Sequence, residues 1–147
     1  MPARAAAGSP AASTRTRFAR AAAETVSALL IERTDFYSVP VADMERAKAF
    51  YRDTLGMESP DWTAPWPEIE TGNVSLYLID PLGVGEEFVP HTAYIALRVA
   101  DVAQARADLE EKGIQFQGDI RDTGVCFMSF FKDSEGNNLM LHHRYAP

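Results

Sequence analysis

The sequence predicts an α+β protein in which one unit of strand, helix and further strands occurs twice. Residues 35–57 read DFYSVPVADMERAKAFYRDTLGM, and residues 93–116 read AYIALRVADVAQARADLEEKGIQF. Each copy places an extended segment before Val-Ala-Asp, continues with a helical pattern and ends the helix near a glycine. One such unit cannot cover both faces of its own sheet. We therefore expect the two units side by side, forming a curved mixed sheet with a cup inside and the helices outside.

The first copy begins with a strand that ends before Asp43. We expect Asp43 to cap the helix, because its carboxylate can accept hydrogen bonds from the free amides of the first turn. One apolar stripe recurs at helical spacing: Met44, Ala47, Phe50, Tyr51 and Leu55. Residues 69–71 and 74–80 are the strands expected after the helix, because Gly-Asn between them is a hairpin turn signal.

The second copy repeats this order. Asp101 takes the capping position, and the apolar stripe of its helix consists of Val102, Ala105 and Leu109. Three extended segments follow, over residues 114–117, 124–131 and 138–143. The polar stretch DSEGN at 133–137 supplies the turn between the last two.

Residues 1–31 form a leader outside this repeat. Residues 1–23 hold four arginines and no acid, and the apolar spacing from Phe18 predicts a helix at about 17–31. An Ala-, Ser- and Arg-rich segment of this kind is typical of an organelle transit peptide, and it is equally typical of a plain disordered leader. We expect a cytoplasmic protein, with organelle targeting by residues 1–23 as the alternative.

Charge and composition exclude several classes of protein. Outside residues 1–23 the chain carries ten basic and 21 acidic residues, so we expect no nucleic-acid partner, which would need clustered Lys and Arg. No apolar run approaches the roughly 20 residues that span a bilayer, so we expect no membrane partner. Cys126 is the one cysteine of the chain and forms no internal disulfide.

The stretches VADMERAKAFYRDTLGM and FFKDSEGNNLMLH closely resemble the vicinal oxygen chelate (VOC) superfamily, the group of glyoxalases, bleomycin resistance proteins and extradiol dioxygenases. The likeness covers about residues 33–145. It implies a single domain over 32–147, made of paired βαβββ modules at 32–82 and 90–147, and commonly a homodimer. It does not imply one reaction, because such folds serve lyases, dioxygenases, epimerases, transferases and binding proteins.

The resemblance also implies where a metal would be bound. In metal-using members the ligands come from the first and last strands of each module. The first-strand ligand lies seven residues before the capping aspartate, a position held here by Phe36 and Tyr94. The last-strand ligand lies four residues after the turn glycine, which gives Leu76 and Met140. Zn, Fe, Mn and Ni sites need nitrogen or oxygen donors that Phe, Leu and Met lack, so we expect no metal and no cofactor.

Alternation along the strands assigns the side chains expected to face the cup. On the last strand His142 has the inward parity and His143 does not. Two tryptophans in the proline-broken stretch SPDWTAPWPE, residues 59–68, are expected at the cup edge. The ligand-binding candidates are Phe36, Ser38, Trp62, Trp66, Leu76, Leu78, Tyr94, Arg98, Met140 and His142.

Arg98 and His142 are also the candidates for catalysis. A guanidinium fork suits a carboxylate, and an imidazole can move a proton. The structural alternatives are an ion pair of Arg98 with an acid at the strand end and a hydrogen bond of His142 at a dimer seam.

The leading hypothesis is a metal-independent VOC-fold protein that binds or sequesters a small aromatic or amphipathic molecule in the cup. Three alternatives stay open. The first is a glyoxalase-type lyase or dioxygenase-type oxidoreductase with a displaced metal site. The second is a metal-free enzyme with His142 as acid or base and Arg98 as anion anchor. The third is a partner-binding role for the leader helix. The sequence predicts neither the identity of the ligand nor whether a reaction is catalysed.

Overall fold

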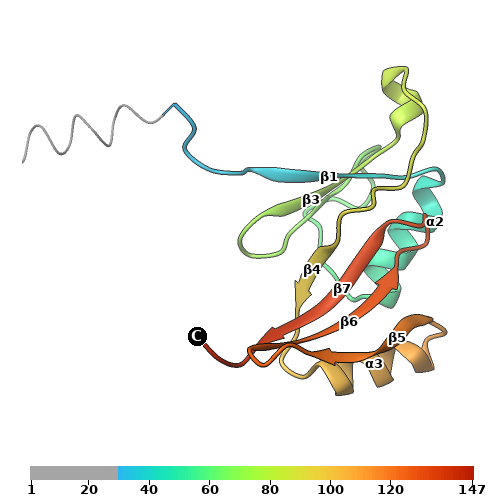
Figure 1. Ribbon diagram of the computed structural model, residues 1–147. Helices are drawn as coiled ribbons and strands as arrows, with labels where there is room; N and C mark the ends of the chain where they lie inside the picture. The colour runs from blue at the N-terminus through green and yellow to red at the C-terminus, as the bar shows by residue number, and fades with distance from the viewer. Residues whose placement is uncertain (1–29) are drawn as a thin grey trace, which may run out of the picture. The chain divides into compact units, whose positions relative to one another are not determined.

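The computed structural model describes residues 30–147, and the chain separates into two units, Met1–Arg33 and Thr34–Pro147. The predicted helix over 17–31 and the targeting interpretation of residues 1–23 lie outside the described residues, apart from Leu30 and Ile31. Among the described residues, no helix is both long enough and apolar enough to cross a membrane. The second unit has the predicted α+β fold, with two mixed sheets that each carry one helical segment (Figure 1).

The first sheet has the strand order β1-β3-β2. Strand β1 (Phe36–Pro40) pairs in parallel with β3 (Ser75–Ile79), and the short β2 (Glu68–Ile69) pairs with β3 in antiparallel fashion. An isolated bridge between Glu58 and Glu70 stands where a further strand of the module would lie. The segment between its partners holds three prolines, which cannot donate to a ladder, so pairing there is reduced to single contacts.

The helical segment of the first module consists of α2 (Met44–Ala49), continued by the π-helical turn η1 (Phe50–Thr54). The predicted cap is confirmed, because the Asp43 carboxylate accepts from the backbone N of Arg46 at 3.0 Å. The predicted apolar stripe is also confirmed: Ala47, Phe50 and Tyr51 are buried, and Met44 and Leu55 pack against the core.

The second sheet has the strand order β4-β7-β6-β5. Strand β4 (Ile95–Arg98) runs parallel to β7 (Asn138–Arg144), and β6 (Cys126–Lys132) and β5 (Phe116–Asp122) complete the sheet in antiparallel pairs. Helix α3 (Val102–Glu111) packs on β5, β6 and β7, and Asp101 caps it through the backbone N of Gln104 at 3.0 Å (Figure 1). Both copies of the predicted repeat therefore fold in the same order.

The core lies between each sheet and its helix. Buried and half-buried residues alternate along β3 and from Asn138 to His142 in β7, as the period of two in a strand requires. The fully buried members of the core come from both modules: Val39, Val41, Ala47, Tyr51, Ile69, Leu78, Phe131 and Leu139. The other sheet face carries no helix, and its side chains are half-buried or exposed.

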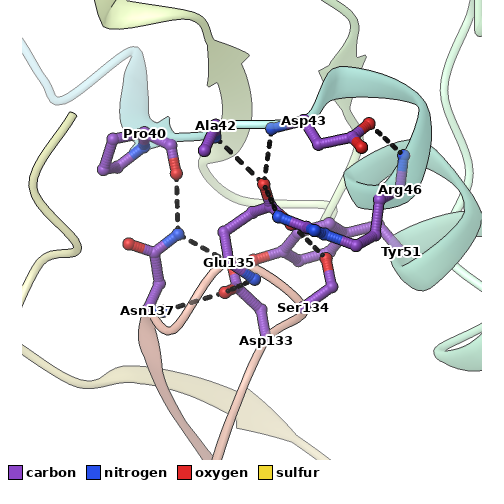
Figure 2. A network of polar contacts seen from close by, with 9 residues as sticks. All are labelled: Pro40, Ala42, Asp43, Arg46, Tyr51, Asp133, Ser134, Glu135 and Asn137. Carbon is purple, nitrogen blue, oxygen red and sulfur yellow. Dashed lines mark hydrogen bonds and ion pairs between the residues drawn. The ribbon is translucent and has the colours of Figure 1, made fainter.

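The DSEGN turn between β6 and β7 joins the second module to the start of α2 (Figure 2). The Glu135 carboxylate accepts from the backbone N of Ala42 at 3.0 Å and of Asp43 at 2.7 Å, and from Arg46 Nε at 2.7 Å. Burial alone would raise the pKa of Glu135, but these bonds and one from Ser134 Oγ outweigh it and hold the pKa below its usual value. The turn thus supplies a charged cap to a helix in the other module.

Asp133 organises the inside of the same turn. Its carboxylate accepts from Tyr51 Oη at 2.7 Å and from the backbone N of Glu135 and Asn137, each at 2.8 Å. Burial, together with the Asp133 charge, raises the pKa of Tyr51 well above its usual value. Asn137 Nδ2 donates to the carbonyl of Pro40 at 2.8 Å, which ties the turn to the end of β1. These buried polar groups are satisfied, so the junction between the modules is rigid.

Candidate functional site

The helix-free face of the second sheet, here called the cup face, is defined by strand register. Met140 and His142 on β7 lie opposite Ala96 and Arg98 on β4. Across the other edge of β7, Phe130 and Met128 on β6 lie opposite the same two β7 residues. The buried residues Leu139 and Leu141 point the other way, toward α3. Met140, His142 and Arg98 therefore share one solvent-accessible face, as the alternation predicted.

Ring contacts place Tyr94 on the same face. Tyr94 precedes β4 and meets Phe130 edge to face, with the ring centroids 5.0 Å apart. The Arg121 guanidinium carbon on β5 lies 5.9 Å from the centroid of the Phe130 ring. Tyr94 is 42% exposed, so its ring is available to a bound molecule. Aromatic rings, a thioether and a guanidinium thus meet around Phe130.

The sequence did not single out Phe130, Met128 or Arg121. In β6, CFMSFFK, large apolar side chains occur on both faces, so alternation of polarity gives no contrast. A bulge in β5 between Gln117 and Arg121 shifts the register there and hides the parity of Arg121.

In the first module, β1 presents Phe36 and Ser38 on its helix-free face, as predicted. The Phe36 ring is 51% exposed and lies 5.3 Å from the ring of Tyr77, centroid to centroid. Ser38 lies opposite Tyr77 in the parallel pairing of β1 with β3. Tyr77 therefore belongs to this face, although the sequence did not identify it.

The prediction of Leu76 and Leu78 as cup residues is wrong. Their side chains are 2% and 0% exposed and belong to the hydrophobic core. The cause is a difference of one residue between the two turns. Met140 lies four residues after Gly136, whereas its register equivalent, Tyr77, lies five residues after Gly72. A slip of one residue moves a strand's whole side-chain set to the opposite face.

The two tryptophans pack on the protein. Trp62 is half-buried against the core, with the Arg52 guanidinium carbon 6.0 Å from its ring centroid. Trp66 lies over the linking 3-10 helix η2 (Pro81–Val84), where a Cβ on Gly83 would come within 3.0 Å of its ring. The structure therefore gives both rings a packing role, and a contact with ligand stays a prediction.

The three histidines do not converge. His142 lies on the cup face, whereas His143 Nδ1 is 2.9 Å from the carbonyl of Val99 on the helix side. His91 Nδ1 is 2.8 Å from the carbonyl of Ala93, and its buried Nε2 has no hydrogen-bond partner. Within residues 30–147, no three His, Cys, Asp or Glu side chains are grouped so that they could hold a metal ion.

An open groove of about 510 Å³ runs along the helix side, between the modules. Leu55 and Met57 after η1 form one wall, Leu109 of α3 forms another, and all five residues from Ile95 to Val99 contact the groove. Side chains from both faces of β4 contact the groove because the groove follows the edge of this strand, which has no neighbour on that side among the described residues. Lys112 crosses its rim and donates from Nζ to the carbonyl of Thr54 at 2.9 Å. The groove adjoins the cup face at the edge of β4, where Ala96 and Arg98 contact it, while core-side residues such as Leu97, Leu109 and Leu141 line its helix side.

Two sheets of this topology, each with one helical segment, define a protein of the paired-module VOC class. Residues 33–141 match the family model described as the Glyoxalase/Bleomycin resistance protein/Dioxygenase superfamily, and the chain belongs to this superfamily.

Individual relatives are more distant. The chain is 28% identical over 108 residues to mitochondrial methylmalonyl-CoA epimerase of Mus musculus, a match that spans 63% of this chain and 60% of the epimerase. The crystal structure of TnmS3, an antibiotic binding protein from Streptomyces sp. CB03234, is 28% identical with a TM-score of 0.64, covering 80% of this chain and 99% of that one. A glyoxalase/bleomycin resistance protein/dioxygenase from Nocardioides has a TM-score of 0.67 at 16% identity, covering 86% and 93% of the two chains, and supports the fold alone.

The superfamily implies a metal in some members, but the residues at the implied positions do not fit one. With the register corrected, the four positions hold Phe36, Tyr77, Tyr94 and Met140. A phenyl ring, two phenols and a thioether include no imidazole or carboxylate, the usual ligands of the divalent metals concerned.

Proposed function

We propose that this protein is a metal-independent member of the superfamily that binds or sequesters a small aromatic or amphipathic molecule on its cup face and on the matching helix-free face of the first sheet. The observation that carries the proposal is the identity of the four implied metal positions, Phe36, Tyr77, Tyr94 and Met140. These side chains offer neither an imidazole nor a carboxylate to a divalent metal, but they can contact a flat apolar molecule.

The surroundings of these residues support the same function. Phe130, Met128 and Met140 are half-buried neighbours, so a ligand there would leave water without displacing charged groups. Few polar groups on an otherwise apolar wall is the usual composition of a small-molecule site. TnmS3, which is described as an antibiotic binding protein, is similar to this chain in sequence and fold and supports small-molecule binding as the class of function.

A homodimer belongs to the proposal. Within the described residues, β1 pairs only with β3 and β4 only with β7, so β1 and β4 are edge strands of their sheets. Free edges with exposed apolar neighbours, such as Phe36 at 51% and Tyr37 at 38%, suit association with a second copy. Light scattering on the purified full chain should give twice the mass of 16.2 kDa.

We place this function in the cytoplasm, as the sequence predicts.

The first test is metal content. Protein purified without a histidine tag and exposed to Zn²⁺, Mn²⁺, Ni²⁺ and Fe²⁺ should retain far less than one ion per chain after gel filtration. One tightly held ion per chain that is lost on Tyr94→Phe or His142→Ala would contradict metal independence and favour the lyase or dioxygenase alternative.

The second test is binding of a neutral aromatic probe, naphthalene-2-carboxamide, measured by calorimetry with and without chelator. Binding should not depend on the chelator and should be lost in Met140→Glu, which places a charge on the cup face. Leu82→Glu is the matched control, because Leu82 is 69% exposed on η2, away from the cup face. Equal binding by both variants and the wild type would contradict a cup-face site.

A metal-free enzyme is the second candidate, and one observation favours it. Arg98 and His142, the predicted catalytic pair, are direct neighbours in the pairing of β4 with β7. An anion held by Arg98 would therefore lie beside an imidazole able to move a proton. If a substrate is found, His142→Ala should lower turnover far more than it weakens probe binding. Undiminished turnover would remove this candidate.

A further inference from the structure

Three of the four strands that build the cup face, β4, β6 and β7, contain no acidic residue. Strand β4 reads IALR, β6 reads CFMSFFK and β7 reads NLMLHHR, in a chain with 21 Asp and Glu. The register places their basic side chains Arg98, Lys132, His142 and Arg144 on the same face as Met140. The cup face of an acidic protein is therefore locally basic.

One row of side chains crosses this face from edge to edge. Arg98 lies opposite His142, His142 opposite Met128, and Met128 opposite Arg121. Neighbouring strands are about 4.8 Å apart, so Arg98 and His142 stand close enough to contact one small anionic group together. Arg121 lies over the Phe130 ring, at the other end of the row.

Arg98 differs from the arginines that have structural roles. Arg46, Arg52 and Arg106 each hold a carboxylate oxygen at 2.7 or 2.8 Å. The side chain of Arg98, by contrast, makes no hydrogen bond or ion pair with any residue in the described part of the chain, and the residue is exposed at the β4 edge of the sheet. The predicted alternative, an ion pair with an acid at the strand end, is absent among these residues.

Neither acid of β5 lies beside Arg98. Asp122 lies opposite Phe127 on the helix side and binds Tyr145 Oη at 2.6 Å and the backbone N of Gly124 at 2.9 Å. Asp119 lies in the β5 bulge, three strands away from Arg98.

We propose that the cup face selects planar aromatic anions, with a carboxylate of the ligand bound by Arg98 beside His142 and its ring packed on Met128, Met140 and Phe130. This inference rests on the proposed small-molecule function and adds the charge of the ligand to it. A guanidinium fork matches both oxygens of a carboxylate, and bonds of this kind are stronger than neutral ones. The net charge of −7 repels anions in general, so anion binding here requires the local basic row.

The test compares two probes of nearly the same shape, naphthalene-2-carboxylate and naphthalene-2-carboxamide, on the full chain. We expect the carboxylate to bind about tenfold tighter at low ionic strength, which equals about 1.4 kcal/mol. The preference should shrink as salt is added, because ion pairs near the surface are screened. It should vanish in Arg98→Gln, in which the carboxylate and the carboxamide should bind with equal affinity.

Lys112→Gln is the matched control. It removes one positive charge, as Arg98→Gln does, but from the C-terminal end of α3, where Lys112 Nζ donates to the carbonyl of Thr54. The carboxylate preference should persist in this variant. A preference that falls equally in both variants would reflect net charge alone and overturn the proposal.

The remaining outcomes separate this inference from the function on which it rests. If the two probes bind the wild type equally and both are lost in Met140→Glu, the small-molecule function stands and anion selection is refuted. If neither probe binds at all, both proposals are refuted.

Discussion

Replacing Glu135 with alanine should destabilise the protein by removing the charged cap that joins its modules. The carboxylate accepts from two backbone amides, of Ala42 and Asp43, and from two nitrogens of Arg46, at 2.7 to 3.1 Å. Its side chain is 0% exposed, whereas that of Arg46 is 53% exposed. Water can therefore solvate Arg46 after the change, but the two amides at the start of α2 lose their acceptor.

The expected cost is about 3 kcal/mol, the lower end of the range for breaking a buried charge pair, because only one partner is left desolvated. With a urea m-value of about 1.5 kcal/mol/M, the unfolding midpoint should fall by about 2 M. Ser134→Ala is the control, since it removes a single neutral donor to the same carboxylate and should cost under about 1 kcal/mol.

A double-mutant cycle with Arg46→Gln tests whether the carboxylate acts through the amides or through the arginine. We expect Arg46→Gln alone to cost less than Glu135→Ala, and the double variant to resemble Glu135→Ala. A Glu135→Ala protein within about 0.5 kcal/mol of the wild type, the range of ordinary surface changes, would refute the view that this turn fastens the modules together.

Three further predictions follow from the same structure. Folding lowers the pKa of Glu135. The stabilisation by its carboxylate should therefore be complete above pH 4.5, the ordinary pKa of the group, and should be lost as the pH falls through the pKa in the folded protein. The urea midpoints of the wild type and Glu135→Ala should converge in acid. Leu78→Ala should lower the free energy of unfolding in urea by about 2–5 kcal/mol, because Leu78 is 0% exposed. Tyr77→Ala should lower it far less but should weaken naphthalene-2-carboxamide binding. The reverse pattern would mean that Leu78, and not Tyr77, faces the ligand. Asp101→Ala should remove the α3 cap and cost about 1 kcal/mol, and an unchanged midpoint would show that the bond to Gln104 contributes nothing.

Local signals were enough to predict the repeated order of elements. Asp43 and Asp101 cap their helices as their positions indicate, and the apolar stripes fall on the buried faces. Each of these features depends on residues within one or two turns of the chain, where spacing determines side-chain direction. The parity of β7 was predictable for the same reason, because buried Leu139 and Leu141 alternate with Met140 and His142.

The sequence did not predict the features that depend on contacts between residues distant in the chain. Tyr77 faces outward because β3 pairs with β1 in one particular register, and a turn longer by one residue defeats any count from a glycine. Composition alone does not distinguish Phe130 from Phe131. Phe130 lies beside Met140 on the cup face, whereas Phe131 is buried on the helix side, and this difference arises only when the sheet forms. The inter-module role of Glu135 was likewise hidden, because its partners lie about ninety residues earlier in the chain.

The most direct test of the central claim, that the metal-lacking cup face is the ligand site, is a spectrum of methyl-labelled methionine. The chain has five methionines, of which Met128 and Met140 lie on the cup face, Met57 lines the helix-side groove and Met44 packs against the core. Titration with naphthalene-2-carboxylate should shift the Met128 and Met140 methyl signals and leave Met44 and Met57 in place. Shifts confined to Met57, or no shift at either cup-face methionine at saturating probe, would contradict the account.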